Sequence, residues 1–75
     1  MHAGAKLDLL MLKDGSRVGV EFKRADAPTL TPSMRIALSD LELQALYVVY
    51  PGPRRYALAE KIEVVPLQAL LPAAG

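Results

Sequence analysis

In each of the segments 7–13 and 17–23 every second residue is apolar: Leu7, Leu9 and Met11 in the first, and Val18, Val20 and Phe22 in the second. This alternation predicts two β-strands, and Asp14-Gly15 between them is a strong signal for a two-residue hairpin turn. A shift of one residue would destroy the match between the strands, so the pattern specifies their register. In that register one face is uniformly apolar, and we expect its residues to be buried together: Leu7, Leu9, Met11, Val18, Val20 and Phe22.

A helical pattern follows the hairpin. Thr31 suits an N-cap and Pro32 suits the first helical position, so we expect a helix from there to about Glu42. One apolar stripe recurs at helical spacing along it and predicts the buried side: Met34, Ala37, Leu38 and Leu41.

The second half of the chain predicts three more strands. The β-branched and aromatic run 45–50 indicates a buried strand, and shorter strands are expected over 54–58 and 62–65. Pro66 then opens a short helix that extends through Leu71. A hairpin followed by a helical crossover to another strand favours a small mixed α/β sheet in the order β-β-α-β-β-β-α. Residues 1–75 are expected to form one domain, with 1–5 and 72–75 loose.

Composition narrows the function classes. The chain has 75 residues, 52% of them hydrophobic, and a chain of this size buries only about three-fifths of its surface on folding. It has no cysteine and one histidine, His2, which excludes thiolate zinc sites and histidine-based catalysis. A net charge of +1 predicts weak contact with DNA. No apolar run approaches the roughly 20 residues of a membrane span, so a cytoplasmic protein without membrane contact is expected.

Some apolar residues have no predicted cover. Leu10 and Leu12 lie on the charged face of the hairpin, and Ile36 and Leu43 lie off the helical stripe. A monomer of this size has no second layer to cover all four. We therefore expect a homodimer or higher oligomer.

The sharpest chemical constellation is on the hairpin. Asp8 is predicted opposite Glu21, with Lys23 two residues along the same face. Two carboxylates, with the carbonyl of Phe22 as a third oxygen, suit Mg²⁺, and the lysine could stabilise charge on a phosphate. The alternative is a solvated charged face on which these residues and Lys6 pair across the strands.

Other polar and aromatic groups are weaker candidates for a functional site. Arg54 and Arg55 could touch phosphates, but a solvated turn is the preferred interpretation. Tyr47, Tyr50 and Tyr56 could stack on bases, but core or rim packing is preferred for tyrosines on apolar strands.

Asp8, followed about a dozen residues later by Glu21-Phe22-Lys23 on a hairpin before a helix, resembles the PD-(D/E)XK nuclease superfamily. The closer resemblance is to a nuclease-like domain of unassigned function at the carboxyl end of a family of bacterial AAA-type ATPases. The matching segments are 6–10, 14–15, 19–23, 48–52 and 64–67. The resemblance implies a truncated restriction-endonuclease-like core, with Asp8, Glu21 and Lys23 as catalytic candidates and the two acids as candidate Mg²⁺ ligands.

The chain departs from that pattern in four respects. Lys6 stands where the family usually has an acid, and Gly19 where it usually has proline. The ATPase phosphate loop is absent from this sequence, as is the helix that normally precedes the first strand. We therefore favour an accessory or interaction module that is not catalytic alone, with an ATPase or another protein as partner. The alternative is a Mg²⁺-dependent DNA nuclease that is active as an oligomer.

Overall fold

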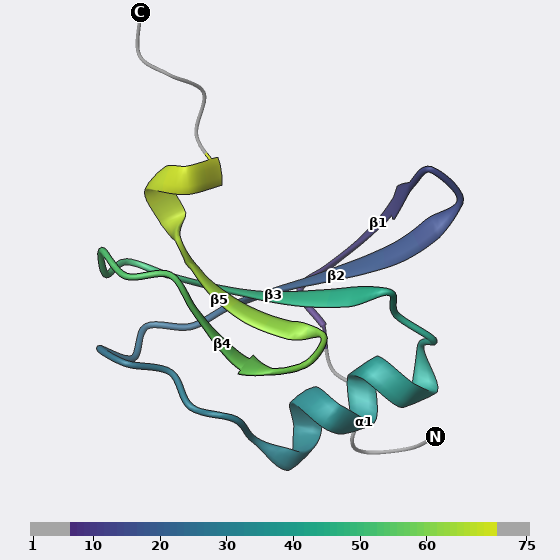
Figure 1. Ribbon diagram of the computed structural model, residues 1–75, viewed down its shortest axis with the longest axis horizontal. Helices are drawn as coiled ribbons and strands as arrows, with labels where there is room; N and C mark the ends of the chain where they lie inside the picture. Colours follow the sequence, from purple (N-terminus) through teal and green to yellow (C-terminus); the bar gives the residue numbers. More distant parts are fainter. Residues whose placement is uncertain (1–6, 71–75) are drawn as a thin grey trace, which may run out of the picture.

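The computed structural model describes residues 7–70, which contain one five-stranded sheet and one α-helix (Figure 1). The elements are β1 (Leu9–Lys13), β2 (Ser16–Phe22), α1 (Pro32–Asp40), β3 (Ala45–Tyr50), β4 (Tyr56–Ala59), β5 (Ile62–Pro66) and the 3₁₀ helix η1 (Leu67–Leu70). The strand order is β1-β2-β3-β5-β4; β3 is parallel to β2 and β5, and the two edge strands are antiparallel to their neighbours. The predicted small mixed α/β fold is confirmed.

Element boundaries differ from the predictions at a few ends. β5 extends through Pro66, and the last helix is a single 3₁₀ turn that begins one residue later. The prediction for Leu71 and the predicted loose segments 1–5 and 72–75 lie outside the described residues. In the described part of the chain, no helix has the length and apolar character needed to cross a membrane.

The hairpin has the predicted turn and register. Asp14 and Gly15 both have positive φ, at 53° and 82°, which is the backbone of a type I′ turn. β1 and β2 pair antiparallel from Leu9 opposite Val20 to Lys13 opposite Ser16, as the alternation predicted.

The register changes at the start of β1. The amide of Asp8 donates to the carbonyl of Val20 at 3.2 Å, although the ladder already pairs Val20 with Leu9. Two consecutive residues therefore oppose one, which is the arrangement of a β-bulge. The prediction that Asp8 pairs with Glu21 is wrong, because the bulge shifts Asp8 out of the alternating ladder.

Helix α1 has well-defined ends. The Thr31 hydroxyl accepts a hydrogen bond from the Met34 amide at 3.4 Å, so the predicted N-cap is confirmed. At the other end, Glu42 has φ 52°, its amide donates to Ser39, and the Leu43 amide donates to Leu38. These two bonds form a Schellman motif, which ends the helix and turns the chain toward β3.

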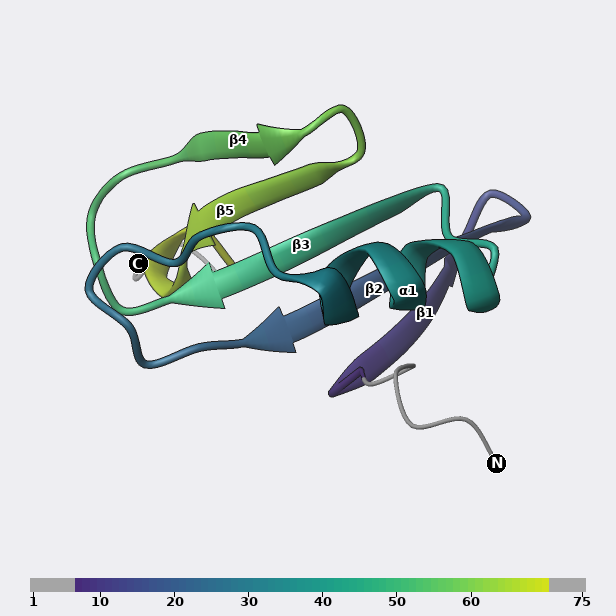
Figure 2. The same cartoon turned by 90° about the horizontal axis from the view of Figure 1, so that it is seen from below.

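The single α-helix covers one face of the sheet (Figures 1 and 2). Its buried residues, Met34 and Ala37, belong to the predicted stripe, and the main core lies between α1 and the sheet. The buried members of this core are Met34, Leu43, Leu46, Val48, Tyr50, Ile62 and Val64.

The opposite face of the sheet, which we call the open face, carries no α-helix (Figure 1). Val20, Val49 and Val65 form a small buried cluster on it. Leu9, Met11 and Phe22 are exposed, Phe22 at 50%, so the prediction that they are buried is wrong for these three. The alternating apolar residues of the hairpin do share one face of the sheet, as predicted. Helix α1, however, packs on the opposite face.

The helix-side face of the hairpin is filled by residues from outside it. A Cβ atom on Gly19 would lie 2.8 Å from a methyl of Leu43 and 2.9 Å from one of Leu7. Leu43, predicted to lack cover, is therefore 4% exposed, while Leu10, Leu12 and Ile36 are exposed as expected.

Candidate functional site

The three predicted site residues line one small cavity near the carboxyl end of β2. Its volume is about 270 Å³, and it is lined by Leu7, Asp8, Glu21, Phe22, Lys23 and Ser33. The bulge at Asp8 and the strand geometry of β2 thus bring together the side chains that the sequence singled out. Their individual contacts determine what the arrangement can do.

The Asp8 carboxylate is already engaged with the backbone. Its Oδ2 atom accepts a hydrogen bond from the Phe22 amide at 2.7 Å. Phe22 is the last residue of β2, beyond the last paired residue of β1. The side chain of Asp8 therefore takes the place of a strand backbone acceptor and extends the pairing of the hairpin.

Glu21 and Lys23 form an ion pair on the helix side of β2. The Glu21 Oε2 atom lies 3.0 Å from Lys23 Nζ, and Glu21 is 9% exposed. A carboxylate this far from water needs a partner, and the ammonium supplies it. The pair runs along one strand and Glu21 is buried, so it differs from the alternative interpretation of a solvated face whose charges pair across the strands. Lys6 lies outside the described residues.

Part of the ligand capacity that a Mg²⁺ site would need is already used within the chain. Asp8 has one oxygen committed to the Phe22 amide, and Glu21 has one committed to Lys23. Within residues 7–70, no group of three or more Asp, Glu or His side chains is placed to hold a metal ion. Two carboxylates that are each partly occupied give Mg²⁺ few protein ligands, and this ion gives up its water reluctantly.

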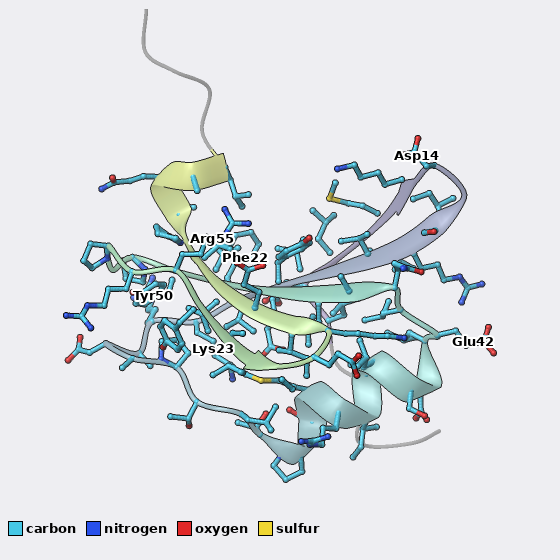
Figure 3. All side chains as sticks on the ribbon, in the orientation of Figure 1. Asp14, Phe22, Lys23, Glu42, Tyr50 and Arg55 are labelled. Atoms are coloured by element: carbon cyan, nitrogen blue, oxygen red, sulfur yellow. The ribbon has the colours of Figure 1, made fainter. Side chains whose placement is uncertain are left out.

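A second cavity lies at the same end of the sheet. Its volume is about 300 Å³, and it is lined by Phe22, Lys23, Arg24, Val49, Tyr50, Pro51 and Leu67. Figure 3 shows Phe22 on the side of the sheet away from α1. The cavity therefore combines apolar walls from β2, β3 and η1 with Arg24 and Lys23, although the Lys23 ammonium pairs with Glu21 on the helix side.

The sequence pattern alone does not indicate this second cavity. It places Phe22 on a buried face and Leu67 in a terminal helix. The available signal was the uniformly apolar face of the hairpin, followed directly in the sequence by the basic pair Lys23-Arg24. That signal points to a docking surface only when it is known that the helix covers the other face.

The family model described as "Domain of unknown function (DUF4143)" matches residues 1–70 of the chain. The chain belongs to the DUF4143 family. An uncharacterised protein of Mycobacterium tuberculosis and one of Mycobacterium bovis are each 42% identical to it over 67 residues, which cover 89% of the chain. The match covers 15% of each of these relatives. No solved structure gives a significant match.

A larger cavity of this DUF4143 chain lies at the opposite end of the strands. It has a volume of about 660 Å³ and includes Arg17, Arg35, Lys61 and Glu42 in its lining. Arg17 already donates to the Leu41 carbonyl at 3.1 Å. The carboxyl end of α1 also lies here, and its partial negative charge opposes an anion. This cavity is therefore a weaker candidate than the pair at the other end of the sheet.

The remaining candidates have structural roles. The Arg55 side chain pairs with Glu63, and this contact raises the pKa of Arg55. The Tyr50 hydroxyl accepts from the Arg54 amide at 2.8 Å, and the Tyr56 hydroxyl donates to the Pro28 carbonyl at 2.7 Å. The two tyrosine rings meet edge to face, 6.3 Å apart. Core and rim packing, the preferred prediction, is confirmed for both tyrosines.

Proposed function

We propose that this DUF4143 domain is an accessory interaction module that is not catalytic alone. The observation that carries the proposal is the cavity between Phe22, Val49 and Leu67, which lies on a sheet face without a helix. Single exposed apolar residues are ordinary on protein surfaces, whereas a contiguous apolar surface rimmed by polar groups is typical of an interaction site.

The cavity defines the chemistry of the partner. Its apolar walls suit a buried aliphatic or aromatic side chain, and Arg24 suits a carboxylate beside that anchor. The partner we propose is a protein segment with an apolar anchor and acidic neighbours. A small apolar anchor in a pocket, with charges at the rim, is the usual composition of a binding hot spot.

The family relationship supports a role within a larger protein. The chain spans about 15% of the length of the mycobacterial relatives that it matches. The resemblance to the carboxyl-terminal domain of AAA-type ATPases, with a truncated restriction-endonuclease-like core, gives the same expectation. We propose an ATPase, or another protein that carries such a segment, as the partner.

Site-specific photo-crosslinking tests the proposal. A benzoylphenylalanine at Leu67, beside the cavity, is expected to form an adduct of defined mass in cells that produce the protein. The same probe at Ile36, an exposed apolar residue on α1, is the matched control. The purified partner should bind at least tenfold more weakly to Phe22→Asp. Equal adducts at both positions, or unchanged binding by this variant, would contradict the proposal.

The second candidate function is a Mg²⁺-dependent DNA nuclease that is active as an oligomer. The observation in its favour is that Asp8, Glu21 and Lys23 line one cavity. One copy offers two partly committed carboxylates, so this function needs further ligands from a second copy or from the substrate. It ranks below the interaction module for that reason.

A further inference from the structure

The three inner strands of the sheet have the composition of strands that are covered on both faces. β2, β3 and β5 run parallel to one another. Every residue of β3 is apolar or aromatic, so the strand does not alternate between apolar and polar side chains. Parallel strands of this kind occur almost only in α/β proteins, in which helices cover both faces of the sheet. Within residues 7–70, α1 covers one face alone (Figures 1 and 2).

The open face presents an apolar surface that extends beyond the cavity beside Phe22. The tip of the hairpin and η1 both rise on this side of the sheet, away from α1 (Figure 1). Between them lies the small buried cluster of valines. The large apolar side chains around this cluster remain between 42% and 50% exposed: Leu9, Met11, Phe22 and Leu67. The surface therefore continues from the cavity toward the turn of the hairpin.

Charge on the open face is nearly balanced. At the strand positions of this face the described residues include one acid, Glu63, and it pairs with Arg55. Lys13, at the hairpin end, is followed directly by Asp14 in the turn. Arg24, at the other end, lines the cavity and has no ion pair within residues 7–70. The face therefore suits an apolar surface that carries acidic groups near one end.

We infer that an amphipathic helix of the partner protein packs across the open face as a second helical layer. Such a helix presents one apolar stripe to the sheet and keeps its polar residues in solvent. The seven residues of β2 span roughly 20 Å, so a helix needs about 14 residues to cover that length. Acidic residues are expected at the end of the helix that lies near Arg24. The proposed docking function is assumed here, and the helix extends it from one anchor in the cavity to the whole face.

The helix of a second copy does not supply this cover. α1 has nine residues, and its buried residues Met34 and Ala37 already pack against its own sheet. Ile36 is the large apolar residue that α1 leaves exposed. A second copy would therefore bring one exposed apolar side chain on its α-helix, where the open face needs a stripe. The occupant that fits is a helix from another protein.

Two synthetic peptides of equal length and composition test this inference. In the first, leucines recur at helical spacing over about four turns, with glutamates at one end. In the second, leucines occupy every second position, which is the pattern of a strand. We expect the first peptide to bind at least tenfold more tightly in fluorescence anisotropy and to gain helicity in circular dichroism as it binds. Equal affinities, or no binding of the first peptide, would overturn the inference.

Substitutions on β1 distinguish a helix on the face from a single anchor in the cavity. Met11→Asp, on the open face and away from the cavity, should weaken binding of the first peptide at least fivefold. Leu10→Asp is the matched control, because Leu10 lies on the same strand with similar exposure but on the opposite face. It should leave the affinity unchanged. Weaker binding by Phe22→Asp but not by Met11→Asp would overturn the helix and leave the docking function in place. The Leu67 adduct described above tests that function by itself.

Two further measurements test the orientation and the occupant. Arg24→Glu should weaken the first peptide at least threefold and should favour a third peptide that has lysines in place of the glutamates. Sedimentation should show no dimer that Met11→Asp abolishes and Leu10→Asp retains. Such a dimer would assign the open face to a second copy, and an unchanged preference in Arg24→Glu would contradict the orientation of the helix.

Discussion

Gly19 shows how one missing side chain shapes the site. It lies on the helix-side face of β2, and the methyl groups of Leu7 and Leu43 occupy the space where its Cβ would be. Leu7 enters from the segment before β1 and also lines the cavity that contains Asp8 and Glu21. The glycine therefore lets the segment that carries Asp8 pack close to the sheet.

We predict that Gly19→Ala lowers the free energy of unfolding by about 1–3 kcal/mol, the usual cost of an overpacked core position. The new methyl group would lie under 3 Å from both leucines unless they move. Urea denaturation measures the loss. In the double variant with Leu7→Ala, the free energy of unfolding should fall by less than the sum of the two single-variant losses, because the two residues share contacts. Strict additivity would argue against this packing.

Tyr56 gives a pH prediction. Burial is the main cause that raises the pKa of its hydroxyl, and nearby Tyr50 adds to it. A group with a raised folded-state pKa contributes stability below its unfolded value, about 10, and loses it as pH rises through the folded value. The free energy of unfolding should therefore fall above pH 10. Tyr56→Phe should show a smaller fall than Tyr47→Phe, and identical profiles would contradict the prediction.

At the scale of elements, the start of β1 depends on a side chain. The Asp8 carboxylate accepts the Phe22 amide that the shortened strand leaves without a ladder partner. We expect Asp8→Ala to destabilise the protein by about 1 kcal/mol and to speed amide exchange at Phe22. Asp8→Asn, which retains an acceptor oxygen, should lose less.

The control for that experiment is Asp26→Ala, which removes a carboxylate from the exposed loop before α1. It should leave exchange at Phe22 unchanged. If Asp8→Ala also leaves this exchange unchanged, the carboxylate does not act as a backbone acceptor, and its place beside Glu21 would need another explanation.

Local signals predicted the elements well. Asp14-Gly15 specified the turn and hence the register, and Thr31-Pro32 specified the start of α1, because both act through nearby backbone groups. The bulge at Asp8 was missed. The alternation of apolar and polar side chains does not indicate a bulge, because the bulge depends on how the segment before β1 packs over Gly19.

At the scale of the whole molecule, the sequence did not predict which face of the sheet α1 covers. The hairpin pattern favoured the face of Val18, Val20 and Phe22, yet the helix packs on the other. The deciding residues are distant in sequence: Leu43 follows the helix and fills the space over Gly19. A periodicity within one hairpin cannot contain that information.

The candidate site was predicted in composition but not in geometry. Asp8, Glu21 and Lys23 do line one cavity, as their spacing suggested. Their mutual contacts were not predictable from spacing, because they depend on the bulge and on the burial of Glu21 beside Lys23. The cavity on the open face could not be found at all without the position of α1 and η1.

The last prediction concerns activity. We expect the 75-residue chain to show no metal-dependent cleavage of double- or single-stranded DNA with Mg²⁺ or Mn²⁺. Each candidate carboxylate has an oxygen committed within the protein, and a net charge of +1 gives little attraction for DNA.

The assay should cover a wide range of protein concentrations, since the alternative function requires an oligomer. Glu21→Gln and Lys23→Ala are the informative variants, with folding checked by circular dichroism. Arg24→Ala, next along the chain but absent from the lining of the Asp8 cavity, is the matched control. Cleavage that requires metal, disappears in both informative variants and survives in the control would replace the interaction module with the nuclease. Absence of cleavage across the whole range would leave Asp8 and the Glu21–Lys23 pair as structural groups that hold the end of β2 beside the docking cavity.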